Sequence, residues 1–239
     1  MKIKILTLTF VFVFLISFSA EGEQEKPEIS IFKTDKTIKI DGNLEEYANF
    51  NPSIRMDDQS FEKLMYNPWN GKNDLSADIY LLWDDENLYV AARIFDDVPF
   101  VNDEEASEIW NGDCLEITLG ANESADPERT FIQNGDYQIG LSPGNNKDIK
   151  PSEWIWRKDD YTGGIEVASG SFEGGYVIES RIPFKVLDDF KPQAGKAIDF
   201  NIAVDDADKD AREIQFVWSG SKNFYIDPSE WGKAIFVIP

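Results

Sequence analysis

Hydrophobic and polar side chains alternate along most of the chain from Ile29 onward. A period of two residues is the pattern of β-strands that bury one face. It predicts two hairpins, formed by residues 77–83 with 88–94 and by residues 165–172 with 176–182. Further strands are expected at 38–40, 113–119, 137–141, 197–204, 214–218 and 234–238, and short helices only at 44–47 and 184–187.

This set of strands constrains the fold class. About ten strands that are separated by turns and never alternate with long helices predict an all-β fold, an antiparallel β-sandwich or jelly roll. Residues 120–135 and 142–164 are rich in Asn, Gly and Asp and are expected to be long loops. The chain has no internal repeat and no linker, so a single domain is expected over residues 29–239.

Residues 1–19 have the layout of a secretory signal peptide. Two lysines precede an apolar run at 5–16, and Ser17 and Ser19 supply small residues at −3 and −1 if cleavage follows Ser19. The run is shorter than the ~20 residues that span a bilayer. We therefore expect an exported protein, periplasmic or extracellular, without membrane insertion after signal removal. Polar residues 20–28 are expected to form a flexible leader.

Charge and composition exclude several functional classes. The net charge of −22, which becomes −24 when the two signal-peptide lysines are removed, would repel nucleic acids and anionic membranes. It is compatible with a neutral or cationic ligand and with divalent cations. One cysteine excludes an internal disulfide framework. Because there is no histidine, the chain lacks the usual general base, the commonest zinc ligand and the partner of a catalytic cysteine.

The segment SEIWNGDCLEITL, residues 107–119, contains that cysteine. As a strand it places Leu115, Ile117 and Leu119 on the core face, with Cys114 and Glu116 on the other. Cys114 is then expected to be a small packed side chain. If the second face is concave, Glu116 would accept hydrogen bonds from a polyol; the alternative is a solvated carboxylate.

The seven tryptophans fall into two groups. Trp83 and Trp218 end strand patterns and are expected in the core. The other five lie in polar, Gly-, Asn- or Pro-rich surroundings: Trp69, Trp110, Trp154, Trp156 and Trp231. Aromatic rings presented by loops stack on sugar C–H bonds, while polar side chains bind the hydroxyls. Plain packing is the alternative for some of these rings.

Acidic clusters suggest a structural calcium ion as the one possible cofactor. The candidate ligands are Asp96, Asp97, Asp206 and Asp208, although the segment at 205–213 lacks the glycine and closing acid of an EF-hand. Solvated surface charge is the alternative. A glycoside hydrolase would need two carboxylates about 5 to 10 Å apart, and no spacing in the sequence nominates such a pair.

Six segments, taken in order, resemble carbohydrate-binding module family 9 over roughly residues 38–238. They are IDGNLEEYA, DIYLLWDDENLYVAARIFDD, IWNGDCLEITL, GGYVIESRIPF, IDFNIAVDDAD and YIDPSEWGKAIF. The resemblance implies a distorted jelly roll that clamps a sugar between two aromatic rings, often with structural calcium.

Matched residue by residue, the resemblance assigns a binding site. Trp110 takes the position of the first ring and Tyr225 that of the second, where tryptophan is more usual. Glu116 takes that of the sheet carboxylate that binds sugar hydroxyls, and Asn223 lies near a polar contact before the second ring. Gln138 completes the set, on a strand that has glycine where some members have an arginine contact.

The resemblance therefore implies an exported, free-standing, non-catalytic protein that binds a saccharide or polysaccharide. Such a protein would serve polysaccharide capture or catabolism, with glycosidases as possible partners. Two alternatives stay open. One is a glycoside hydrolase, or an accessory part of one, that uses a carboxylate pair. The other is a structural surface-assembly module, which would require the rings at 110 and 225 to be buried in the core.

Overall fold

The computed structural model describes residues 26–122 and 124–239, so the expected signal peptide and most of the expected leader lie outside the described residues. The described residues form thirteen strands and five short 3-10 helices. None of these helices is long and apolar enough to cross a membrane. The strands are β1 (Glu28–Lys33), β2 (Ile54–Met56), β3 (Glu62–Met65), β4 (Leu75–Trp83), β5 (Asn87–Asp96), β6 (Cys114–Gly120), β7 (Asp136–Ser142), β8 (Ser152–Trp156), β9 (Glu166–Phe172), β10 (Gly175–Pro183), β11 (Ala197–Asp206), β12 (Ile214–Val217) and β13 (Gly232–Val237). The helices are η1 (Glu45–Tyr47), η2 (Gln59–Phe61), η3 (Ala106–Asn111), η4 (Phe184–Leu187) and η5 (Pro228–Glu230).

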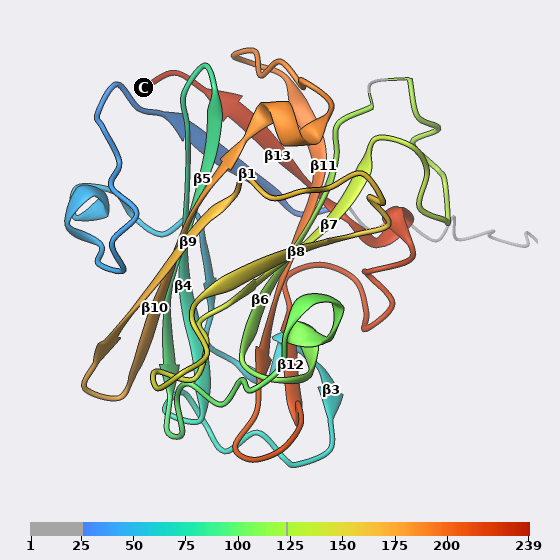
Figure 1. Cartoon of the computed structure of the whole chain (residues 1–239). Coiled ribbons are helices and arrows are strands. Elements are labelled where there is room, and N and C mark those ends of the chain that lie inside the picture. Colours follow the sequence, from blue (N-terminus) through green and yellow to red (C-terminus); the bar gives the residue numbers. More distant parts are fainter. Residues whose placement is uncertain (1–25, 123) are drawn as a thin grey trace, which may run out of the picture.

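The strands follow the order β8-β7-β6-β11-β13-β1-β4-β5-β10-β9, with β2, β3 and β12 joined at the side. This continuous sheet doubles over into a sandwich (Figure 1). We call β4, β5, β9 and β10 the first layer, and β6, β7, β8, β11 and β12 the second layer. All pairings are antiparallel except those of β1 with β13 and with β4. The predicted all-β sandwich is therefore confirmed, with one parallel strand that local sequence patterns do not reveal.

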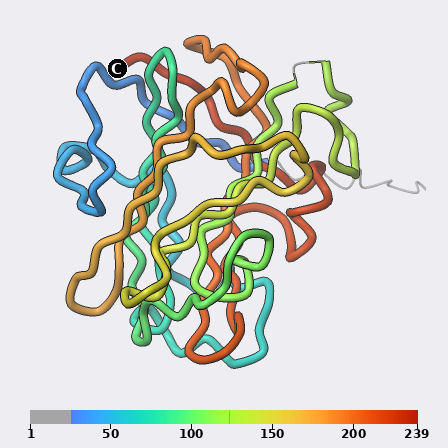
Figure 2. Tube along the Cα trace, in the orientation of Figure 1, coloured from blue at the N-terminus to red at the C-terminus, as the bar shows by residue number. Residues whose placement is uncertain are grey.

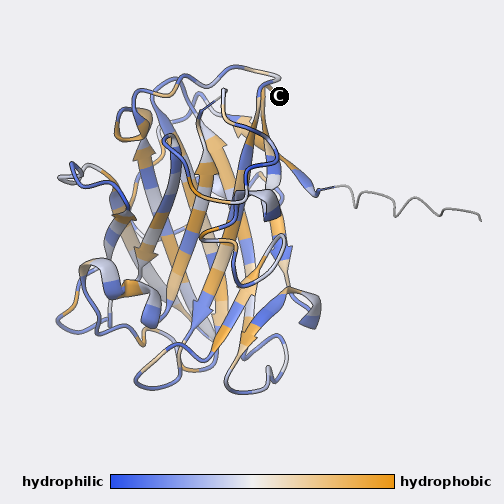
Figure 3. Ribbon diagram, turned by 90° about the vertical axis from the view of Figure 1, so that its right-hand side faces the viewer, coloured by the Kyte–Doolittle hydropathy of each residue, from blue (hydrophilic) through white to orange (hydrophobic). Residues whose placement is uncertain are grey.

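The core lies between the inner faces of the two layers. On β6, Leu115, Ile117 and Leu119 are at most 1% exposed and belong to the same hydrophobic cluster as Val90 and Ile94 of β5. Figure 3 shows the resulting alternation of hydrophobic and hydrophilic positions along the strands. Fully burying such a side chain stabilises the fold by about 1.5–3 kcal/mol relative to leaving it exposed. The predicted core face of residues 113–119 is thus confirmed.

The structure corrects several predicted elements. Residues 38–40 are not a strand; Ile38 is buried because it packs, with Tyr47 of η1, on Leu82 of β4. The predicted loop at 142–164 contains β8, and β1 begins at Glu28, the last residue of the expected leader. The sequence pattern does not predict β1, β2, β3 or β8. β1 and β3 are held by β13 and β12, which are distant in sequence, whereas β2 and β8 are short strands that pair with the nearer β4 and β7. The short helices expected at 44–47 and 184–187 are confirmed as η1 and η4.

The segment between β1 and β2 covers the outer face of the first layer, meaning the face turned away from the other layer. It forms a loop beside that layer (blue in Figure 2). Glu179 of β10 points outward beneath it and is 0% exposed. Its Oε2 accepts hydrogen bonds from the backbone N–H groups of Asp41 at 3.0 Å and Gly42 at 3.2 Å. This carboxyl group therefore fastens the loop to the sheet.

Candidate functional site

A hollow on the outer face of the second layer gathers most of the candidate residues. Glu116 points outward from β6, and the residues opposite it on the flanking strands are Gly140 of β7 and Ala203 of β11. Both are small, so larger side chains can pack over them beside Glu116: Ala203 shares a buried cluster with Phe224 and Trp231. A Cβ at position 140 would lie 2.5 Å from the ring of Trp156, so glycine allows that ring to lie over β7. The resulting pocket has a volume of about 280 Å³.

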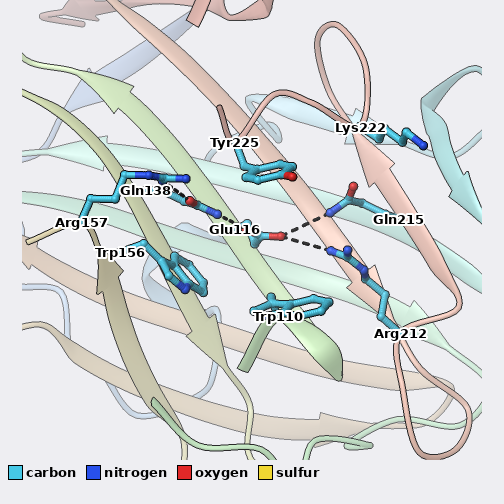
Figure 4. Close-up of a pocket in the computed structure, with 9 residues that line it drawn as sticks. All are labelled: Trp110, Glu116, Gln138, Trp156, Arg157, Arg212, Gln215, Lys222 and Tyr225. Atoms are coloured by element: carbon cyan, nitrogen blue, oxygen red, sulfur yellow. Dashed lines mark hydrogen bonds and ion pairs between the residues drawn. The ribbon is translucent and has the colours of Figure 1, made fainter. Parts of the chain in front are cut away.

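Nine side chains line this pocket, and they come from strands, a 3-10 helix and loops (Figure 4). They are Trp110, Glu116, Gln138, Trp156, Arg157, Arg212, Gln215, Lys222 and Tyr225. Trp110 is half-buried at the end of η3, and Tyr225, in the loop between β12 and β13, is 40% exposed. Figure 4 shows their rings on opposite sides of the Glu116 carboxylate, with an open gap between them. The two rings therefore border the same pocket.

Glu116 is held at the floor of the pocket, where it is 3% exposed. Its Oε2 accepts a hydrogen bond from Gln138 Nε2 at 2.7 Å, and its Oε1 accepts from Gln215 Nε2 at 3.3 Å. Burial, followed by the negative charge of Asp205, raises the pKa of Glu116 well above its usual range. The polar groups of the floor are thus fixed by one another before any ligand arrives.

Arg212 balances the acidic groups of the floor. Its Nη1 donates to Asp205 Oδ1 at 2.8 Å and lies 3.4 Å from Glu116 Oε1. Its guanidinium carbon is also 5.0 Å from the centroid of the Trp110 ring, within the range of a cation–π contact. Arg212 therefore joins the floor of the pocket to one of its two facing rings.

The structure brings together four of the five residues assigned from the sequence: Trp110, Tyr225, Glu116 and Gln138. Asn223 does not line the pocket. It is exposed, and its backbone carbonyl accepts hydrogen bonds from the N–H groups of Ile226 and Asp227, so it shapes the loop that carries Tyr225.

Sequence reasoning missed four pocket residues: Arg157, Arg212, Gln215 and Lys222. Gln215 could have been found, because alternation along 214–218 places it opposite the core face. No signal in the sequence distinguished the three cations from ordinary surface charge.

The remaining loop tryptophans take different positions. Trp156 lines the pocket, and its Nε1 donates to the carbonyl of Ser107 at 3.1 Å, whereas Trp154 lies on the same strand outside the pocket. Trp231 is 0% exposed and donates to the Phe224 carbonyl at 2.6 Å, so its assignment as a presented ring is wrong. Trp69 packs against the core with its Nε1 bonded to the Leu75 carbonyl. Core packing, rather than the polar residues beside them in sequence, decides these two positions.

The single cysteine needs no chemical role. Cys114 is fully buried beside the floor of the pocket, and burial raises the pKa of its thiol well above its usual range. A thiol that stays protonated is a poor nucleophile and a poor metal ligand. The expectation of a small packed side chain is confirmed.

A second acidic group lies at the end of the sandwich, on the core side of the sheet. Oxygen atoms of Asp96, Asp113 and Asp206 lie within 4.8 Å of one another, and those of Asp96, Asp97 and Asp208 form an overlapping set. Among the described residues, Asp96 Oδ2, Asp206 Oδ1 and Asp208 Oδ1 are buried without a hydrogen-bond partner. Burial and neighbouring carboxylates raise the pKa of Asp96 to about 7 and that of Asp206 to about 10.

This group contains all four aspartates that the sequence nominated for calcium, together with Asp113, which the sequence did not nominate. Five carboxylates that converge from the ends of β5 and β11 and the start of β6 form an oxygen-rich set suited to Ca²⁺. The unpartnered oxygens are the atoms that a bound cation would contact.

Residues 40–237 match the model of a family described as carbohydrate family 9 binding domain-like, which confirms the resemblance. The chain is 27% identical over 195 residues to endo-1,4-beta-xylanase A of Thermotoga neapolitana. It is 28% identical over 199 residues to the enzyme of the same name from Thermotoga maritima. Each match covers 81% of this chain but only 16% of the xylanase.

Two solved structures share the fold. A family 9 carbohydrate-binding module from Caldicellulosiruptor kristjanssonii in complex with cellotriose superposes with a TM-score of 0.66 at 19% identity, over 89% of this chain and 95% of that one. The same organism's module in complex with glucose gives a TM-score of 0.63 at 20% identity, over 88% and 96%. At these identities the likeness establishes the architecture of the sandwich.

Proposed function

The chain belongs to the carbohydrate family 9 binding domain-like family, and from that premise we propose that it binds a saccharide, without catalysis, in the gap between Trp110 and Tyr225. The observation that carries the proposal is the pair of rings facing each other above a polar floor (Figure 4). The C–H bonds on the two faces of a pyranose pack against aromatic rings. The hydroxyls at its edge would bind Glu116, Gln138 and Gln215.

The relatives support a role in polysaccharide capture. The matched xylanases carry a similar segment as a small part of much longer chains, and the two similar structures contain cellotriose and glucose. We propose β-glucan or xylan oligosaccharides as the first ligands to test. Export through the signal peptide expected at residues 1–19 would bring the protein to such polysaccharides outside the cytoplasm.

A hydrolase is less well supported. Glu116 is the one carboxyl group among the side chains that line the pocket, and the neighbouring Asp205 is 0% exposed and is held by Arg212 and Gln215. Among the described residues, the pocket lining therefore offers no second carboxylate across the gap from Glu116, whereas hydrolysis needs two carboxylates that flank the scissile bond. A purely structural module is also disfavoured, because Tyr225 is 40% exposed and belongs to the open pocket.

We also propose a structural calcium ion at the aspartate cluster. Asp96, Asp113 and Asp206 would supply buried carboxylate oxygens, with Asp97 and Asp208 nearer the surface. Bound calcium would neutralise acids that otherwise face one another away from water, and would tie the ends of β5 and β11 to the start of β6. The buried oxygens without partners support this assignment.

The test compares Trp110→Ala with Trp154→Ala by isothermal titration calorimetry against glucose, cellotriose and xylotriose. Trp154 is the matched control because it lies two residues from Trp156 on the same strand but does not line the pocket. Loss of one stacking ring is expected to weaken binding more than about tenfold, whereas the control should bind like the unchanged protein. Absence of binding by the unchanged protein to any member of a broad glycan panel would refute the proposal.

A further inference from the structure

The charge of the pocket differs in sign from the charge of the protein. The chain has 45 acidic and 23 basic residues, yet the pocket is lined by three cations, Arg157, Arg212 and Lys222, and by one acid, Glu116. Arg212 is paired with Asp205 and contacts Glu116. Within the described part of the chain, neither Arg157 nor Lys222 has a carboxylate within ion-pair distance. Two of the cations that line the pocket therefore have no ion-pair partner in this part of the chain.

Arg157 is the better placed of these two cations. It follows Trp156 at the end of β8, and its φ of 61° is in the left-handed region. Such a backbone conformation costs of order 1 kcal/mol for a residue with a side chain. Here it turns the side chain back toward Gln138, beside the open gap (Figure 4).

The guanidinium of Arg157 still has free hydrogen-bonding capacity. Nη1 donates to Gln138 Oε1 at 2.7 Å, and no other described side chain or backbone group accepts from it. A guanidinium carries about five N–H donors in a planar fork that matches a carboxylate, so most of them remain for a ligand. Lys222, on the loop that carries Tyr225, adds a second positive charge on the other side of the gap.

Glu116 does not pair with these two cations. Its two oxygens are capped by Gln138 on one side and by Gln215 and Arg212 on the other. It lies at the floor, where Arg212 contacts both it and Asp205. An anionic group at the rim, beside Arg157, would meet donors first and the capped carboxyl group only behind them.

We propose that the preferred ligand is an acidic sugar, a hexuronate whose pyranose ring lies between Trp110 and Tyr225 and whose carboxylate binds Arg157. This inference rests on the proposed function and narrows its ligand class. A hexuronate keeps a closed ring that stacks, whereas an aldonate has the same charge on an open chain. The overall charge of the chain predicts a neutral or cationic ligand. The pocket instead favours an anionic ligand, because Arg157 and Lys222 line it without ion-pair partners among the described residues.

The experiment measures affinities of the whole protein by calorimetry for glucuronate, glucose and gluconate at low ionic strength. Glucuronate is expected to bind at least about tenfold more tightly than glucose, because a hydrogen bond between charged groups contributes free energy of that size. Added NaCl should reduce the difference in affinity, because salt screens the charges. Arg157→Gln should lower the glucuronate-to-glucose affinity ratio about tenfold. The control Arg55→Gln, which removes the same charge from β2, should leave that ratio unchanged.

The outcomes separate this inference from the proposed function. If glucose binds in a Trp110-dependent way and glucuronate binds no better, the acidic-sugar inference is wrong and the sugar site stands. If gluconate binds as tightly as glucuronate, the carboxylate acts without ring stacking and the inference is overturned. If neither these sugars nor oligosaccharides bind, both the inference and the proposed function fail.

Discussion

Replacing Glu179 by glutamine should change how the stability of the protein depends on pH. Glu179 is 0% exposed. Its Oε2 accepts hydrogen bonds from the backbone N–H groups of Asp41 and Gly42. Its Oε1 is buried without a hydrogen-bond partner among the described residues. A glutamine carbonyl oxygen would keep both hydrogen bonds to the loop while removing the ionisable group.

The expected magnitude follows from the pKa of this group. Burial, opposed in part by the two backbone N–H groups, raises the pKa of Glu179 from 4.5 to about 7. Because the pKa in the folded state is above that in the unfolded state, the protonated group stabilises the fold fully below about pH 4.5. That stabilisation is lost as pH rises through about 7. At 1.36 kcal/mol per pKa unit, the loss amounts to about 3 kcal/mol by pH 8.

Urea unfolding followed by tryptophan fluorescence at several pH values between 4 and 8 measures this effect. Glu179→Gln should match the unchanged protein near pH 4 and exceed its free energy of unfolding by about 3 kcal/mol at pH 8. Glu166→Gln is the control, because Glu166 is in an exposed ion pair with Arg181 and should change stability by less than about 1 kcal/mol. A difference between Glu179→Gln and the unchanged protein that does not vary with pH would refute the reasoning.

Two further predictions concern the cluster of aspartates and the second ring. Adding Ca²⁺ at about 100 times its Kd to protein stripped with EDTA should stabilise it by about 2.7 kcal/mol, a rise in Tm of about 5–10 °C. Asp206→Asn should diminish that rise, and an unchanged Tm in the unsubstituted protein would rule out the calcium site. Tyr225→Trp should tighten cellotriose binding about two- to fivefold, since the larger ring covers more of a sugar face. Calorimetry checks this, and weaker binding would show that the gap has no room for the second indole.

Much of the fold and of the site was accessible from the sequence because side-chain alternation is a local property. Alternation identified the β4–β5 and β9–β10 hairpins and the core face of β6. The same alternation predicted that Glu116 lies on the face opposite the core, where the structure has the pocket. The order of degenerate motifs then nominated Trp110 and Tyr225, which lie about a hundred residues apart in the chain, as partners.

Tertiary structure decided what depends on distant neighbours. β1 pairs in parallel between β13 and β4, and Trp231, in surroundings as polar as those of Trp110, is buried by Phe224 and Val217. Asp113 joins Asp96 and Asp206 only when three strand ends meet.

The same holds for charge. A net charge of −22 is a sum over the whole chain, whereas a ligand experiences the few charges within a Debye length of about 8 Å. Only the folded chain places Arg157 and Lys222, without paired acids among the described residues, at the rim of one pocket.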